Sequence, residues 1–124
     1  IESKTQEIDY SARCMEIDLR PTGLACTLIT NTVYACTVDL ERGAGTGNAE
    51  FNGVIAVFSV QGKEDVTVEA ETGNIDVMGE DSFITDVADA VNFDATKVKI
   101  TPYFDKKGGG KYPCPGATEY NNLA

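Results

Sequence analysis

The 124-residue sequence contains no histidine and no tryptophan. Histidine is the side chain most often used as a general base, so a Ser-His-Asp or Cys-His catalytic arrangement cannot be built from this chain. A hydrolase that uses two carboxylates, as in glycoside hydrolysis, stays an alternative because the chain has 20 acidic residues. The small size of the chain and the lack of an indole ring to stack on a sugar weigh against that alternative.

Long hydrophobic runs are absent as well. The longest, at residues 54–58, is far shorter than the roughly 20 apolar residues that cross a bilayer, so we expect no transmembrane segment. No signal-like segment opens the chain, and Ile1 stands in place of an initiator Met, so we expect a mature or trimmed product. Hydrophobic residues make up 42% and charged residues 24%, which suits one globular domain over residues 1–124.

The four cysteines are Cys14, Cys26, Cys36 and Cys114, and none forms a Cys-x-x-Cys pair. Zinc sites are ordinarily built from such short ligand pairs, so two disulfides in an oxidising compartment are the better interpretation. A hairpin centred on Asn31 places Cys26 opposite Cys36, and Cys14 is then free to reach Cys114 in a distant loop. We therefore prefer the pairs Cys26–Cys36 and Cys14–Cys114, although the sequence leaves the other two pairings open.

Apolar and polar residues alternate with a period of two in four segments, at residues 14–20, 24–28, 34–40 and 66–70. This pattern indicates half-buried strands. Residues 54–58 are apolar on both faces, which predicts the central strand of a sheet covered on both sides. About seven short strands separated by turn signals predict a mostly β fold, a small antiparallel sandwich or barrel stabilised by the disulfides.

One segment departs from this alternation. Between residues 82 and 92 the apolar side chains fall at helical spacing behind Asp81 or Ser82 as a possible N-cap. The pattern predicts at most one short helix near residues 82–92, with a loop as the alternative.

Positive charge is scarce, since 10 Lys and Arg accompany 20 Asp and Glu, for a formal net charge of −10. Ten of the 20 acidic residues lie in residues 64–94, a stretch with no Lys or Arg. Such a stretch repels phosphate backbones, so we expect no nucleic-acid partner. The simple interpretation is a solvated surface that keeps the protein soluble. The alternative is a surface that meets a partner of opposite charge.

The acidic stretch contains a candidate calcium site, where Asp76, Glu80 and Asp81 bracket the glycine turn at Gly79. Calcium prefers hard oxygen ligands such as these carboxylates. The spacing does not fit the twelve-residue helix-loop-helix site, because that site needs glycine at its sixth position and Gly79 is fourth from Asp76. We expect no other cofactor and no metal bound by cysteine.

The segment at residues 105–116 is the candidate partner-binding loop. Its glycines leave the backbone unrestricted, and lysines stand beside aromatic residues, the usual ingredients of an interface core. The predicted binding residues are Tyr103, Phe104, Lys106, Lys107, Lys111 and Tyr112. In the alternative interpretation Tyr112 packs inward, Cys114 tethers the loop and the lysines only balance the acidic surface.

Together these features predict a secreted, non-enzymatic interaction protein, of an effector-like, toxin-like or surface-associated kind. Its expected partner is an extracellular protein or a cell-surface component. Two alternatives stay open: a surface or filament subunit that assembles by strand addition at an exposed sheet edge, and a small carboxylate-based hydrolase.

Overall fold

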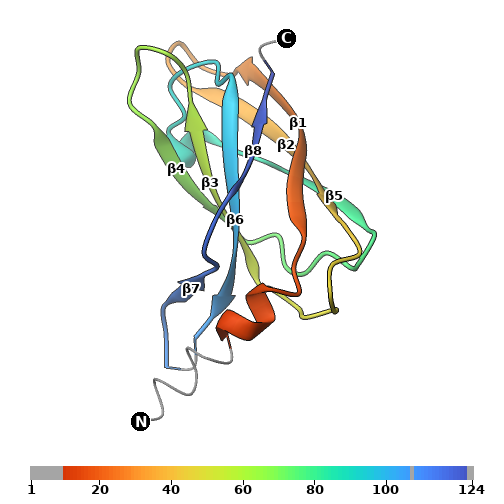
Figure 1. The fold of residues 1–124 in the computed structure, drawn as a ribbon. Helices are drawn as coiled ribbons and strands as arrows, with labels where there is room; N and C mark the ends of the chain where they lie inside the picture. Colours follow the sequence, from red (N-terminus) through yellow and green to blue (C-terminus); the bar gives the residue numbers. More distant parts are fainter. Residues whose placement is uncertain (1–9, 107, 123–124) are drawn as a thin grey trace.

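The computed structural model describes residues 10–106 and 108–122, which form a sandwich of two antiparallel sheets (Figure 1). The first sheet contains, in spatial order, β1 (Leu19–Leu28), β2 (Tyr34–Arg42) and β5 (Glu80–Ile84). The second contains β4 (Val66–Ala70), β3 (Gly53–Ser59), β6 (Lys97–Asp105), and then β7 (Lys111–Pro113) and β8 (Thr118–Asn121), both paired with β6. The predicted mostly β sandwich is therefore confirmed, with eight strands.

The core lies between the inner faces of the two sheets. Alternate residues of β2 and β3 point into it, and the central ones, among them Val38, Val54 and Phe58, are fully buried. Each such side chain contributes about 1.5–3 kcal/mol through burial. The expectation that β3 is covered on both faces is wrong, because Ile55 and Val57 are only half-buried on the outer face.

The predicted helix is a single 3₁₀ turn, Val87–Asp89, inside the expected window. Its N-cap is Asp86 rather than Asp81 or Ser82, and Asp86 and Asp89 form a capping box. The first part of the window belongs to β5 instead. These residues form a strand because their backbone groups hydrogen-bond to β2, although the spacing of their side chains suits a helix.

A short α-helix at residues 10–14 replaces the start of the strand that alternation predicted there, and β1 begins only at Leu19. Tyr10 stacks on Phe104 and Tyr112, with ring centroids 5.6 and 5.3 Å apart. These contacts hold the helix on the lower end of the second sheet (Figure 1).

Both preferred disulfides are present. Cys26 and Cys36 are direct cross-strand partners in the β1–β2 hairpin, with Cα atoms 4.0 Å apart. Cys14 and Cys114, with Cα atoms 5.5 Å apart, join the helix at residues 10–14 to the segment that follows β7. The bridge Cys26–Cys36 thus closes a hairpin, and the bridge Cys14–Cys114 joins segments near the beginning and the end of the sequence.

The two long sides of the sandwich differ. On one side β8 is linked to β1, since Thr118 Oγ1 donates to Leu19 O at 2.8 Å and Asn122 Nδ2 donates to Leu24 O at 3.3 Å. On the other side, the outermost strands are β4 and β5, which belong to different sheets. Hydrogen bonds thus connect the two sheets along the side of β1 and β8. On the opposite side, β4 and β5 are the edge strands of their sheets.

Gly53 leaves room for a buried aromatic ring, so we expect Gly53→Ala to destabilise the fold. Gly53 lies opposite Tyr103 in the β3–β6 ladder, and a Cβ atom added there would fall 2.5 Å from Tyr103 Oη and against the carbonyl of Ala70. Such overpacking costs about 1–3 kcal/mol. Urea unfolding measures the effect, and Ser59→Ala at the other end of β3 is the control, with a change within about 0.5 kcal/mol. Equal stability of the two variants would contradict the contact.

Candidate functional site

The aromatic residues of the predicted binding loop pack within the protein. Tyr103 and Phe104 are each 1% exposed. Phe104 lies beneath Tyr10 and the guanidinium of Arg13, whose Cζ is 4.5 Å from the ring centroid. Tyr112 is half-buried in the same stack. The expectation that Tyr103 and Phe104 offer exposed anchors is therefore wrong, because the helix and Lys111 cover them.

The lysines of this loop have different surroundings. Lys111 Nζ lies 3.3 Å from Glu69 Oε2 and 5.3 Å from the ring centroid of Tyr103. The hydrogen bond and charge of Glu69 raise the pKa of Lys111, whereas burial raises the pKa of Tyr103. Lys106 is exposed, and Lys107 lies outside the described residues. Contact of this loop with a partner stays a prediction. It now rests on the positive charge of the loop, because the aromatic residues pack within the protein.

The three calcium candidates do not converge. Glu80 and Asp81 are exposed on β5, whereas Asp76 lies near Arg42, where its charge partly opposes the lowering of the arginine pKa by burial. In the part of the chain that the structure describes, no group of three or more acidic or other ligating side chains could hold a metal ion. The glycine turn therefore separates the carboxylates that the sequence places within six residues.

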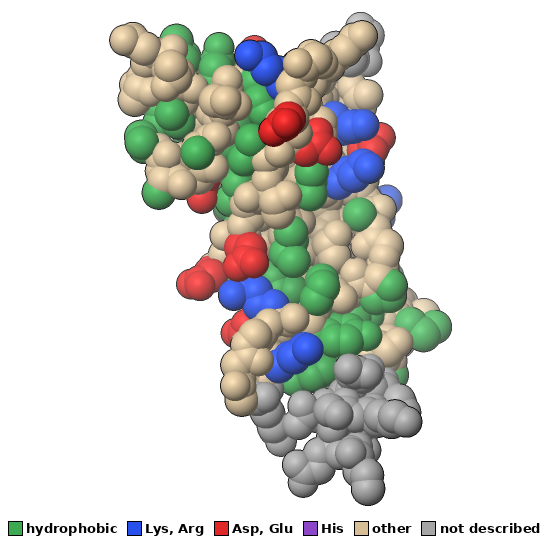
Figure 2. Space-filling model, turned by 90° about the vertical axis from the view of Figure 1, so that its left-hand side faces the viewer, with side chains coloured by type: hydrophobic (Ala, Val, Ile, Leu, Met, Phe, Trp, Pro, Cys, Tyr) green, Lys and Arg blue, Asp and Glu red, His purple; other side chains and the backbone are tan. Residues whose placement is uncertain are grey.

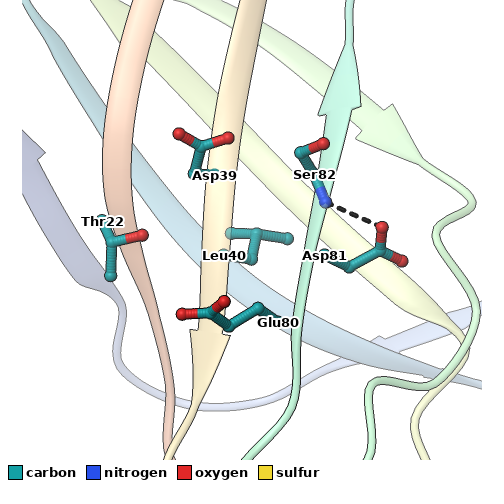
Figure 3. A pocket seen from close by; sticks show the side chains of 6 residues that line it. All are labelled: Thr22, Asp39, Leu40, Glu80, Asp81 and Ser82. Carbon is teal, nitrogen blue, oxygen red and sulfur yellow. Dashed lines mark hydrogen bonds between the residues drawn. The ribbon is translucent and has the colours of Figure 1, made fainter.

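The structure instead gathers acidic side chains on the outer face of the first sheet, in a hollow of about 350 Å³ that we call the outer hollow (Figure 3). Its lining residues are Thr22, Asp39, Leu40, Glu80, Asp81 and Ser82. Strand register creates it, since Asp39 in β2 lies between Gly23 of β1 and Ser82 of β5.

Two local features shape this hollow. A Cβ atom on Gly23 would lie 2.6 Å from Asp39 Oδ2, so glycine leaves the space that the carboxylate fills. Glu80 lies directly opposite Glu41, and like charges in that arrangement destabilise a sheet. Among the described residues, no Lys or Arg forms an ion pair with Asp39, Glu80 or Asp81. Negative charge is therefore concentrated here and left uncompensated.

A second hollow of about 400 Å³ runs between β4 and β5, and we call it the edge groove. Its apolar lining comes from Val68, Ala70, Phe83 and Ile84. Asp81 and Ser82 line both hollows. Its acidic lining residues are Glu69, Glu71, Asp81, Asp86 and Asp89. Figure 2 shows the molecule from the side of β4, where acidic side chains in red stand beside hydrophobic ones in green.

Backbone amides and carbonyls of β5 face the edge groove. Thr85 N donates to Cys36 O, and Arg42 N donates to Gly79 O, both at 3.0 Å. Alternation in an antiparallel ladder then turns the backbone groups of residues 80, 82 and 84 away from β2. Ser82 N donates to Asp81 Oδ1 at 2.8 Å, as Figure 3 shows. Within the described structure, no hydrogen bond occupies the outward amide of Ile84.

No protein family, curated protein or solved structure matches this chain. In the described residues, no helix combines the length and the apolar character that a membrane crossing requires.

Seven carboxylates line the two hollows, and one of them, Glu69, pairs with Lys111. We name the other six the β5 acidic surface: Asp39, Glu71, Glu80, Asp81, Asp86 and Asp89. Five of them come from the acidic stretch at residues 64–94, so the sequence signal did point to this region. Asp39 was missed because only the pairing of β2 with β5 brings it there. Chemically, such a surface attracts cationic groups and repels anions.

Proposed function

We propose that the chain is a secreted, non-enzymatic interaction domain that recognises a positively charged extracellular protein or cell-surface component through the β5 acidic surface. The observation that carries the proposal is the placement of six carboxylates around one edge strand, without an ion pair to any of them among the described residues. The two disulfides support an oxidising, extracellular setting. Complementary charge contributes both specificity and association rate in such contacts.

Recognition suits this surface better than catalysis does. A carboxyl that acts as general acid is kept protonated by an apolar environment. The side chains of Asp39, Glu80 and Asp81 are instead exposed, in a hollow on a sheet face. Solvated carboxylates bind cations but do not offer the pair of contrasting environments that glycoside hydrolysis uses.

A charge variant tests the proposal. It carries Asp39→Asn, Glu71→Gln, Glu80→Gln and Asp81→Asn, and it leaves Asp86 and Asp89 in place because they cap the 3₁₀ helix. We expect extracellular proteins retained by the immobilised natural chain at about 0.05 M salt, and released at about 0.5 M, to be lost from this variant.

The matched control removes the same number of charges elsewhere. It carries Glu50→Gln, Glu64→Gln, Asp65→Asn and Asp94→Asn, four exposed positions that line neither the outer hollow nor the edge groove. We expect it to retain the same proteins as the natural chain. Equal losses from both variants would mean that net charge alone holds the partner, and no loss from either would place the contact elsewhere.

A further inference from the structure

We infer that the edge groove receives an extended basic segment of a partner polypeptide, which adds to the free edge of β5 as a further strand. This inference rests on the proposed function for the charge of the partner. It adds the mode of binding, namely backbone pairing with β5, and the alternating sequence pattern that such a segment carries.

The backbone of β5 supplies the first argument. Residues 80, 82 and 84 turn their amides and carbonyls away from β2, toward the side where no described strand pairs with β5. An unpaired strand edge is a template for another strand, and peptide recognition by strand addition uses this geometry. Ile84, which is 64% exposed, offers its outward amide without competition from a described side chain.

The lining of the edge groove supplies the second argument. A strand added beside β5 points alternate side chains to opposite faces of the sheet. One set enters the edge groove, where Val68, Ala70 and Phe83 stand beside carboxylates such as Asp81, and the other set lies on the outer face beside Glu80. The fitting segment alternates apolar with Lys or Arg residues over about five positions, the length of β5, and in either register its basic side chains meet carboxylates.

Charge selects this occupant over a second copy of the chain. Two copies with a formal net charge of −10 each repel one another, and charged residues on edge strands are a common protection against self-pairing. The Asp81 carboxylate also occupies the outward amide of Ser82. A basic segment compensates that carboxylate as it pairs, whereas a second acidic edge does not.

The test uses two synthetic probes of equal charge, the peptide Ac-Lys-Val-Lys-Val-Lys-Val-Lys-NH₂ and the same peptide with its five central amides methylated. Methylation removes the hydrogen-bond donors and keeps the lysines. We expect the unmodified probe to bind the full chain and to protect the Ile84 amide from hydrogen exchange. The methylated probe should bind at least tenfold more weakly and leave that amide unprotected.

Two substitutions at one position complete the test. Ile84→Pro removes the outward amide without breaking the β2 ladder, and proline is tolerated on strand edges of this kind. We expect it to bind the unmodified probe at least tenfold more weakly than Ile84→Ala does, because Ile84→Ala loses the same side-chain contact with the edge groove but keeps the amide. Circular dichroism of both variants confirms that the sheets are intact.

Each other outcome overturns the inference. Equal affinity of the two probes, with no effect of Ile84→Pro, would show charge attraction without strand pairing, and the proposed function would survive if the charge variant still lost binding. Absence of probe binding up to about 1 mM would rule out the basic segment. Self-association in analytical ultracentrifugation that Ile84→Pro abolishes would identify a second copy as the occupant instead.

Discussion

Replacing Cys14 and Cys114 by alanine is expected to lower the free energy of unfolding by about 4.7 kcal/mol. This value is the entropic cost, in the unfolded chain, of closing a loop of about 100 residues. The two cysteines are 100 positions apart, whereas Cys26 and Cys36 are separated by 10. The same relation gives about 2.7 kcal/mol for the shorter loop. The long-range bridge should therefore contribute roughly 2 kcal/mol more than the hairpin bridge.

The native state adds a local consequence. Without Cys14–Cys114, the helix at residues 10–14 keeps only its side-chain contacts, chiefly the Tyr10 stack and the bond from Tyr10 Oη to Asp105 O at 3.2 Å. We expect amides of this helix to lose hydrogen-exchange protection before the core strands do.

Urea unfolding of the two double-alanine variants measures the difference, with the natural chain under oxidising conditions as reference. Cys14, Cys36 and Cys114 are all buried, so truncation adds a packing loss to both variants, and the difference between them still reports the two loop lengths. A Cys14→Ala, Cys114→Ala variant as stable as the natural chain would show that the tether does not constrain the unfolded state.

The sequence predicted the fold class because its signals are local. Alternation around Asn31 sets the β1–β2 hairpin, and the register that follows brings Cys26 opposite Cys36 as expected. With one pair assigned, the second disulfide follows by elimination and matches the structure.

The missed features depend on contacts between distant residues. The pairing of β2 with β5 makes residues 80–84 a strand, and the pair Asp39–Ser82 places Asp39 in the β5 acidic surface. No pattern within either segment predicts this pairing. Burial of Tyr103 likewise depends on Gly53, which lies 50 positions earlier and opposite the ring. The acidic composition of residues 64–94 showed where charge gathers, but the edge groove is a product of sheet order.

Arg42 is the one buried residue with a positive charge in the described structure, and we expect Arg42→Ala to destabilise the fold by about 3–5 kcal/mol, since each acceptor left without its donor costs about 1–3 kcal/mol. Its guanidinium donates to three acceptors: Asn74 Oδ1 at 3.1 Å, Ile75 O at 2.9 Å and Ala49 O at 2.7 Å. Burial lowers the pKa of Arg42, and the charges of Asp76 and Glu16 oppose that effect. Truncation leaves the two carbonyls without this donor, which costs more than the bonds themselves contribute.

Arginine at this position joins segments that no strand ladder connects, because one planar group reaches the loop before β3 and the loop before β5 together. Arg42→Lys keeps the charge but not the fork of donors, so we expect an intermediate loss of about 2 kcal/mol in urea unfolding. Arg20→Ala is the control, since Arg20 is exposed and its pair with Asp18, at 3.6 Å, contributes at most about 1 kcal/mol. If Arg42→Lys matched the natural chain, charge and not the three-way hydrogen bonding would account for the stabilisation.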